Sequence, residues 1–195
     1  MKHASSGETP ALVEHLERVL GPIEHGWSTD PDGVTMPLQV VKFSAGSDVN
    51  SVGYATLGLS RHNHRSSVSG QAVRQELLML ASNAVDEDVV ASLLIQIGMN
   101  AMSVHPVLRG QVIGPAEPLL PGSSLTALYA APPVYFPDNF STCVVDGETV
   151  FITWLIPIST DEATFVLNRG WEAFEEELAR HDPDLVDFGR PGLEI

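Results

Sequence analysis

The sequence is short of basic residues: it has 10 Lys and Arg against 25 Asp and Glu, a formal net charge of −15. A protein that binds along nucleic acid needs Lys and Arg to neutralise the phosphates. The charge therefore argues against DNA, RNA and anionic membrane surfaces as direct partners. It leaves a basic protein partner or a small neutral ligand as the binding classes to consider.

Cysteine is nearly absent too, since Cys143 stands alone and cannot form an internal disulfide. We interpret it as a structural thiol, because Phe140 and Val144 on either side are apolar. No uninterrupted apolar run of about 18 residues predicts a membrane helix. No apolar segment follows Lys2 to form a signal peptide. We expect a soluble protein of a reducing cytoplasm.

The common catalytic motifs are missing as well. The sequence contains no phosphate-binding glycine loop, no nucleophile elbow, no H-E-x-x-H helix and no C-x-x-C pair. We therefore predict a protein that is not an enzyme and that holds no cofactor or metal ion.

The segments that are present predict one mixed sheet covered by helices, an α+β or mixed α/β fold. Residues 38–43, 54–60, 73–81 and 125–130 have the composition of strands. The strand after the Asp146-Gly147 turn is apolar on both faces, so it should be central, with Pro157 at its end. A loop is predicted over 27–33. We expect a flexible terminus over 1–9, one domain over 10–190 and a tail over 191–195.

Three helices are predicted from capping residues and apolar spacing. The first follows the Thr9-Pro10 pair and ends at Gly21. The second begins after Asp86, and its apolar stripe includes Val90, Leu94 and Ile97. The third begins with the Ser159–Glu162 capping box and continues as one helix through Gly170 to about Arg180.

Two clusters are candidates for contact with a partner. The first is Arg61-His62-Asn63-His64-Arg65, in which His62 and His64 share a face if the segment is extended. The two arginines disfavour a metal cation between these histidines, so an exposed loop or a partner-contact patch is the better interpretation. The second is the acidic face of the last helix, formed by Glu172, Glu175 and Glu176.

The acidity is concentrated near the C-terminal end. From Asp161 onward there are ten acidic and three basic residues, a net charge of −7. Between Val89 and Pro137 only Glu117 and Arg109 are charged. A basic partner is therefore expected to dock on the last helix and the tail that follows it.

Four segments resemble the suppressor of fused domain family: Pro37–Phe43, Ala55–Ser60, Arg74–Met79 and Val150–Ile158, the last followed by Glu162 and the Gly170-Trp171 pair. The resemblance covers about residues 37–190. It implies a mixed sheet with helices packed on it, and a binding module instead of an enzyme. It also implies a bacterial single-domain member, similar to immunity proteins that bind and neutralise a cognate toxin.

Two other functions stay open from the residues alone. One is a hydrolase or metal enzyme that uses His62, His64, His105 or Cys143. The other is a small-ligand binder that uses the uncharged middle third of the chain as a pocket.

Overall fold

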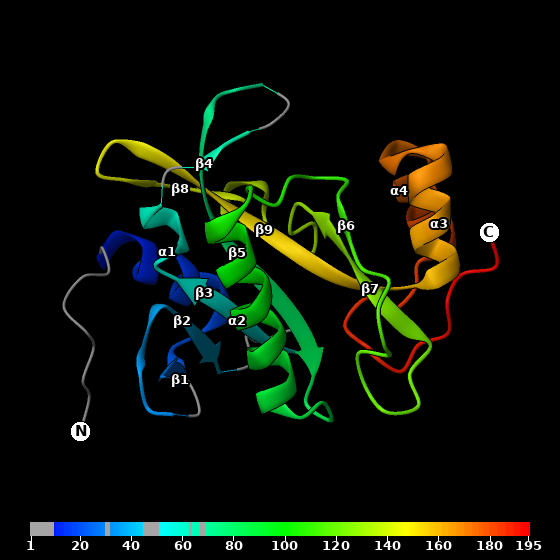
Figure 1. The fold of residues 1–195 in the computed structure, drawn as a ribbon, viewed down its shortest axis with the longest axis horizontal. Helices are drawn as coiled ribbons and strands as arrows, with labels where there is room; N and C mark the ends of the chain where they lie inside the picture. Colours follow the sequence, from blue (N-terminus) through cyan, green and yellow to red (C-terminus); the bar gives the residue numbers. More distant parts are fainter. Residues whose placement is uncertain (1–9, 30–31, 45–50, 63, 67–68) are drawn as a thin grey trace.

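The fold, a computed structural model, is described for residues 10–29, 32–44, 51–62, 64–66 and 69–195 (Figure 1). Its helices are α1 (Pro10–Leu20), α2 (Glu87–Ser103), α3 (Thr160–Arg169) and α4 (Trp171–His181), with short 3-10 helices η1 (Leu59–Arg61) and η2 (Asp138–Phe140). Its strands are β1 (Ile23–Thr29), β2 (Thr35–Phe43), β3 (Ser51–Leu57), β4 (His64–Arg65), β5 (Ala72–Ser82), β6 (Val112–Ile113), β7 (Leu125–Ala131), β8 (Thr142–Val145) and β9 (Glu148–Ser159).

The strands form one mixed sheet in the order β1-β2-β3-β5-β9-β7-β6, with β4 paired to β5 and β8 paired to β9. Only the β5–β9 pair is parallel among the described strands. One edge of β9 pairs with β8 as far as Phe151 and with β7 from Trp154 onward. The sheet partner on that edge therefore changes within the strand, and residues 132–141 loop out between β7 and β8.

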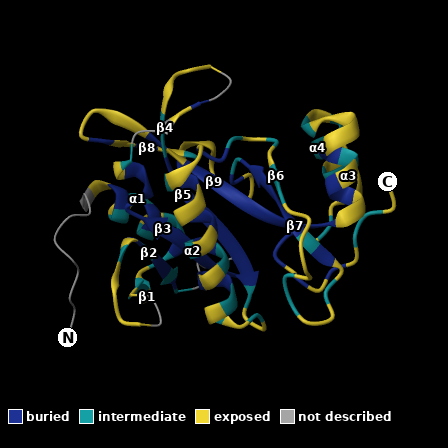
Figure 2. Cartoon of the chain, in the orientation of Figure 1, coloured by how far each residue is buried: buried dark blue, intermediate teal, exposed yellow. Residues whose placement is uncertain are grey.

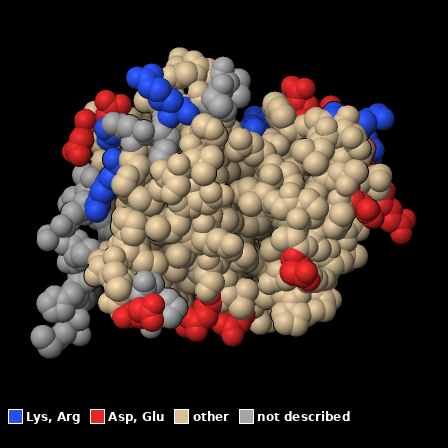
Figure 3. All heavy atoms as spheres, viewed as in Figure 1, with Lys and Arg blue, Asp and Glu red and all other residues tan. Residues whose placement is uncertain are grey.

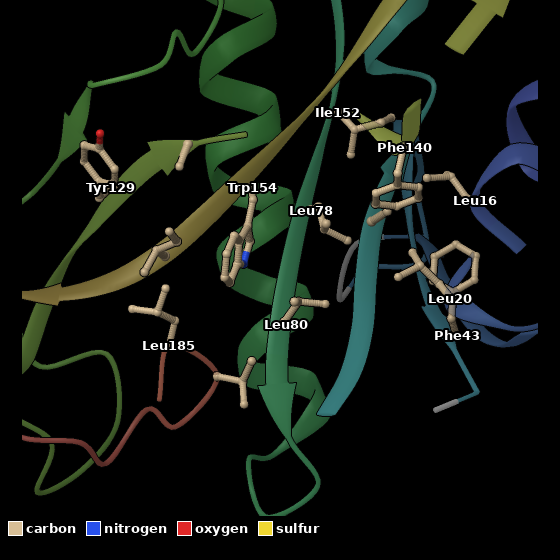
Figure 4. Close-up of a cluster of buried hydrophobic side chains, with 14 of the residues drawn as sticks. Leu16, Leu20, Phe43, Leu78, Leu80, Tyr129, Phe140, Ile152, Trp154 and Leu185 are labelled. Atoms are coloured by element: carbon tan, nitrogen blue, oxygen red, sulfur yellow. The ribbon is translucent and has the colours of Figure 1, made fainter. Parts of the chain in front are cut away.

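Helices cover both faces of the sheet and enclose two cores. α2 packs on one face with Leu77 and Leu155 beneath it. On the other face α1, α3 and α4 pack over Leu78 and Trp154. Figure 2 shows β5 and β9 buried along most of their length, and Figure 4 shows part of the second core around Trp154. Residues alternate between the two cores along β2, β3, β5 and β7, as the pleat requires.

The structure confirms the mixed α+β fold and most of the predicted elements. Asp86 caps α2 through its carboxylate, which accepts from the Asp88 N–H at 2.9 Å. Ser159 and Glu162 form the reciprocal capping box of α3. The strand with two apolar faces is β9, which lies at the centre of the sheet as predicted.

Four predictions about local structure are wrong, and the first two concern a loop and a helix. The predicted loop begins inside a strand, because β1 extends to Thr29 and pairs with β2. Its largely exposed residues lack the apolar alternation that marks a half-buried strand. The predicted single last helix is two helices, since Gly170 has φ 87° and ψ 162° and interrupts the chain between α3 and α4.

Pro157 does not end its strand either. β9 continues to Ser159, and Pro157 lies opposite Leu128 of β7. The pairing between β9 and β5 ends at Trp154, so β9 pairs only with β7 at Pro157. Proline has no N–H to donate, and it is tolerated where a strand has no neighbour on one side. The predicted strand over 54–60 is also shorter, because β3 ends at Leu57 and η1 follows it.

Two predictions lie outside the described residues: the flexible segment 1–9 and the N-cap at Thr9. Within the described residues, no helix is long and apolar enough to cross a membrane.

Candidate binding site

A pocket of about 310 Å³ lies where β8 replaces β7 beside β9. β5, β9, the ends of β7 and β8, and the segment that leaves α2 contribute its wall. The wall is mostly apolar, and its residues are Val73, Gln75, Val107, Leu108, Arg109, Ala131, Pro132, Ser141, Thr142, Phe151, Ile152 and Thr153. Gln75 and Thr153 lie two residues before Leu77 and Leu155, which belong to the core under α2. Because alternate residues of a strand share a face, Gln75 and Thr153 lie on the same face of the sheet as α2.

The pocket lies where α2 does not cover this face of the sheet. α2 ends at Ser103 after packing against β2, β3 and β5, and it leaves the start of β9 uncovered. Phe151 is 46% exposed and Val144 on β8 is 66% exposed. The β8–β9 register places Thr142 opposite Phe151 and Val144 opposite Thr149, so these four residues share one face. The result is a solvent-exposed strip of uncharged residues beside the pocket.

Gln75 is the unusual residue of the pocket wall. It is 2% exposed, and neither its amide nitrogen nor its amide oxygen has a hydrogen-bond partner among the described residues. A buried polar group without a partner costs roughly 1–3 kcal/mol of stability, so native proteins contain few of them. Its neighbour across the parallel ladder is Phe151, which places the unpaired amide beside the exposed strip.

Arg109 links the pocket to the last helix. Its guanidinium donates to both carboxylate oxygens of Glu175, at 3.1 and 2.5 Å, and lies 4.2 Å from the ring centre of Trp171. The Tyr129 hydroxyl donates to the same carboxylate at 2.8 Å. The chain approaches Trp171 closely at Gly110, where any side chain larger than hydrogen would collide with the indole.

Two pKa shifts follow from this cluster. The pKa of Tyr129 is raised, first because the phenol is buried and then because its hydroxyl donates to Glu175. The hydrogen bond with Glu175 raises the pKa of Arg109. Both groups therefore hold their protons more tightly than they do in water, and the cluster ties the pocket wall to α4.

A buried carboxylate fixes the turn after β3. Glu76 accepts from the Thr56 hydroxyl at 2.7 Å, from the N–H groups of Gly58 and Ser60 at 3.0 Å, and from the Ser60 hydroxyl at 2.7 Å. Burial raises the pKa of this carboxyl, although the four hydrogen bonds oppose the shift. Two of the segments that resemble the suppressor of fused family, Ala55–Ser60 and Arg74–Met79, therefore meet at Glu76.

A second buried carboxylate fixes the C-terminal tail. Arg190 donates to both oxygens of Glu162, at 2.9 and 3.3 Å, and to the carbonyl oxygen of Pro157 at 3.0 Å. Glu162 also accepts from the Ser159 N–H within the capping box. The irregular tail is thus bound to the start of α3 by an ion pair that is almost fully buried.

The predicted acidic face lies on α4 and is only partly free. Glu175 is engaged by Arg109 and Tyr129, whereas Glu172 and Glu176 are exposed. Glu177 lies within 2.6 Å of Arg180. Arg109 and Arg180 therefore neutralise two of the carboxylates that made this helix acidic in the sequence.

The predicted histidine cluster follows β3, and its Asn63 lies outside the described residues. Arg61 ends η1 and is exposed, and His62 is its half-buried C-cap. The backbone of His64 pairs with Val73 in the short ladder between β4 and β5. This ladder places the cluster beside one end of the pocket wall, where Val73 lies.

The other candidate residues lie apart from one another. Cys143 is buried on β8, its sulfur lies 3.8 Å from the carbonyl oxygen of Ala11, and burial raises its pKa. A thiol of that kind is poorly reactive. His105 is exposed just after α2. Among the described residues, no three His, Cys, Asp or Glu side chains gather to hold a metal ion.

The sequence suggested a pocket in the uncharged middle third of the chain but not the residues that β5, β8 and β9 contribute to it. Gln75 looked like an ordinary residue of a strand, and Phe151 looked like part of a covered face of β9. The available signal was the uncharged middle third of the chain, which supplies Val107, Leu108 and Pro132 to the wall.

The fold defines the class of the molecule: a mixed α+β domain in which β9 and β5 form the parallel centre of one sheet. Residues 35–191 match the family model described as Suppressor of fused protein. The chain belongs to the suppressor of fused family. A search of curated proteins finds no significant match.

Solved structures share this fold. A suppressor of fused homologue from Neisseria gonorrhoeae has a TM-score of 0.74 at 16% identity, covering 95% of this chain and 96% of that chain. A chain of the Sufu–Fu complex has a TM-score of 0.71 at 18% identity, covering 95% of this chain and 93% of that chain. Drosophila Suppressor of Fused has a TM-score of 0.66 at 18% identity, covering 94% of this chain and 51% of that one. This chain thus spans about half the length of the Drosophila protein.

Proposed function

We propose that the protein is a non-catalytic binding module that recognises another protein through the face of the sheet that carries α2. The main support is the strip of exposed, uncharged residues on β8 and β9, in which Phe151 is 46% exposed and Val144 is 66% exposed. Apolar side chains exposed together beside a pocket are typical of an interaction surface. Membership of a family with a structure in complex with a second protein supports the same function.

The partner that we propose is a bacterial toxin, which this protein would neutralise as an immunity protein. A basic toxin would be attracted by the net charge of −15, which raises association rates at low salt. Glu172 and Glu176 on α4 supply exposed carboxylates near the pocket, because Arg109 joins the pocket wall to Glu175 of the same helix. One partner can therefore contact the acidic helix and the uncharged strip together.

The test is co-expression with the protein encoded beside this gene, followed by purification of the complex and an assay of host survival. We expect a stable complex and protection from the neighbouring gene product. The Phe151→Asp variant should lose both. Val34→Asp is the matched control, because Val34 is 61% exposed and precedes β2 near the other edge of the sheet. A protein that neither binds nor protects, or a Phe151→Asp variant with full activity, would contradict the proposal.

A further inference from the structure

We propose that the pocket binds one uncharged apolar side chain of a protein partner, and that the Gln75 amide pairs with the partner's backbone beside that side chain. This inference rests on the proposed protein-binding function and specifies the chemistry that the site recognises.

The size of the pocket and its surroundings favour a side chain over a free small molecule. Pockets for complete ligands commonly span about 300–1,000 Å³, and this one, at about 310 Å³, lies at the lower limit. Val144 is exposed beside the pocket and does not line it. A molecule small enough to fill the pocket would leave Val144 in water, whereas a protein surface covers both.

The charge of the wall determines which side chain fits. Among the described residues no carboxylate lines the pocket, so a lysine or arginine of the partner would lose its hydration without gaining an ion pair. The charged residue of the described wall is Arg109, which Glu175 and Trp171 already engage. An acidic side chain would have to compete with Glu175. Figure 3 shows the same property on a larger scale: the face that carries α2 is mostly uncharged, and charged groups lie around its margin.

The Gln75 amide determines what else the partner presents. A primary amide offers a carbonyl acceptor and an NH₂ donor, and an extended peptide backbone offers the complementary N–H and C=O. The parallel pairing of Gln75 with Phe151 sets the amide next to the ring that faces the partner. Both amide atoms are buried in the free protein, so the Gln75 side chain must turn toward the pocket that it lines before a peptide segment over Phe151 can pair with them. The side chain of that segment then fills the apolar wall formed by Val107 and Pro132.

Capped tripeptides test the pocket directly. In an NMR titration of the ¹⁵N-labelled full chain, acetyl-Ala-Leu-Ala-amide should shift the side-chain amide resonances of Gln75 and the backbone resonances of Phe151 and Thr153. Acetyl-Ala-Asp-Ala-amide should bind at least about tenfold more weakly, since Glu175 already engages the cation of the wall. Equal binding of the two peptides, or shifts confined to other surfaces, would overturn the inference.

Variants separate the amide from the apolar wall. Gln75→Leu has a similar volume and should weaken the leucine peptide about tenfold through the two lost hydrogen bonds. The same variant should raise the melting temperature of the free protein, because the buried unpaired amide is gone. Gln39→Leu on β2 is the matched control and should leave peptide binding unchanged. Full peptide affinity in Gln75→Leu would refute the role of the amide.

The complex with the full-length partner distinguishes this inference from the proposed function. If Phe151→Asp abolishes the complex and Gln75→Leu leaves its affinity unchanged, the protein-binding function stands and the pocket inference is wrong. If both variants weaken it and Gln39→Leu does not, both proposals are supported. If no protein partner binds, the proposed function fails, and the inference fails with it.

Discussion

The carboxylate of Glu76 provides the sharpest test of how this domain is held together. Replacing Glu76 with leucine leaves the N–H groups of Gly58 and Ser60 buried without an acceptor. Each unsatisfied donor costs about 1–3 kcal/mol, which gives roughly 2–6 kcal/mol for the pair. Burial of the leucine returns about 1–2 kcal/mol. We therefore expect the free energy of unfolding of Glu76→Leu to fall by about 1–4 kcal/mol.

The glutamine variant is the matched control for this substitution. Its amide oxygen can still accept from the N–H groups of Gly58 and Ser60 and from the Ser60 hydroxyl. The Thr56 hydroxyl accepts from the Leu77 N–H at 2.8 Å and can also accept from the glutamine NH₂, but its own proton loses the carboxylate oxygen to which it donates. One buried donor is then unpaired, so Glu76→Gln should lose about 1–3 kcal/mol.

The pH dependence of the free energy of unfolding distinguishes the effect of the Glu76 charge from the effect of its size and hydrogen bonds. Burial raises the pKa of Glu76 in the folded protein above the ordinary value of 4.5, so the folded state holds this proton more tightly than the unfolded state does. Its contribution to stability is therefore full below pH 4.5, declines as the pH rises through the raised folded pKa, and is constant above it. Glu76→Gln lacks this decline, so it should gain stability relative to the wild type as the pH rises across that window.

Urea unfolding followed by tryptophan fluorescence at a series of pH values measures all three proteins. A leucine variant as stable as the wild type would refute the hydrogen-bond argument. A difference between the glutamine variant and the wild type that does not change with pH would refute the raised pKa.

Three further predictions concern other parts of the molecule. Arg190→Met should cost about 3–5 kcal/mol in urea unfolding, because it leaves the buried Glu162 carboxylate without its cation; an unchanged midpoint would show that the ion pair is dispensable. Gly170→Ala should lower the melting temperature through about 1–3 kcal/mol of backbone strain, since φ there is 87° and no atom lies within 4 Å of the added carbon. Tyr129→Phe should cost about 1 kcal/mol by removing the hydrogen bond to Glu175, and a larger loss would indicate a rearranged core.

Local signals predicted much of this fold. Asp86 and the Ser159–Glu162 box mark helix starts within four residues of sequence, and the structure contains both caps. The apolar residues of β5 and β9 predicted buried strands because burial on both faces leaves few polar positions. Where the forces that form an element act between neighbours, the sequence is sufficient.

Elements set by distant contacts were missed. β1 is an exposed edge strand that forms because β2 pairs with it, and β8 has four residues held between β9 and α1. The break at Gly170 preserves the apolar stripe on both sides, so spacing alone suggested one helix.

The candidate site was the hardest part to predict. Arg109 and Glu175 are 66 residues apart, and no local pattern joins them. The absence of a partner for Gln75 among the described residues is a property of the folded interior, which only the packed structure contains.

In the proposed complex, a protein partner covers the β8–β9 strip and the pocket beside it. Hydrogen–deuterium exchange of the protein, alone and in complex with its partner, tests this directly. We expect added protection over 141–153 and over 105–111, the segments that form the strip and much of the pocket wall. Protection confined to β1 and β2, with these two segments unchanged, would contradict it.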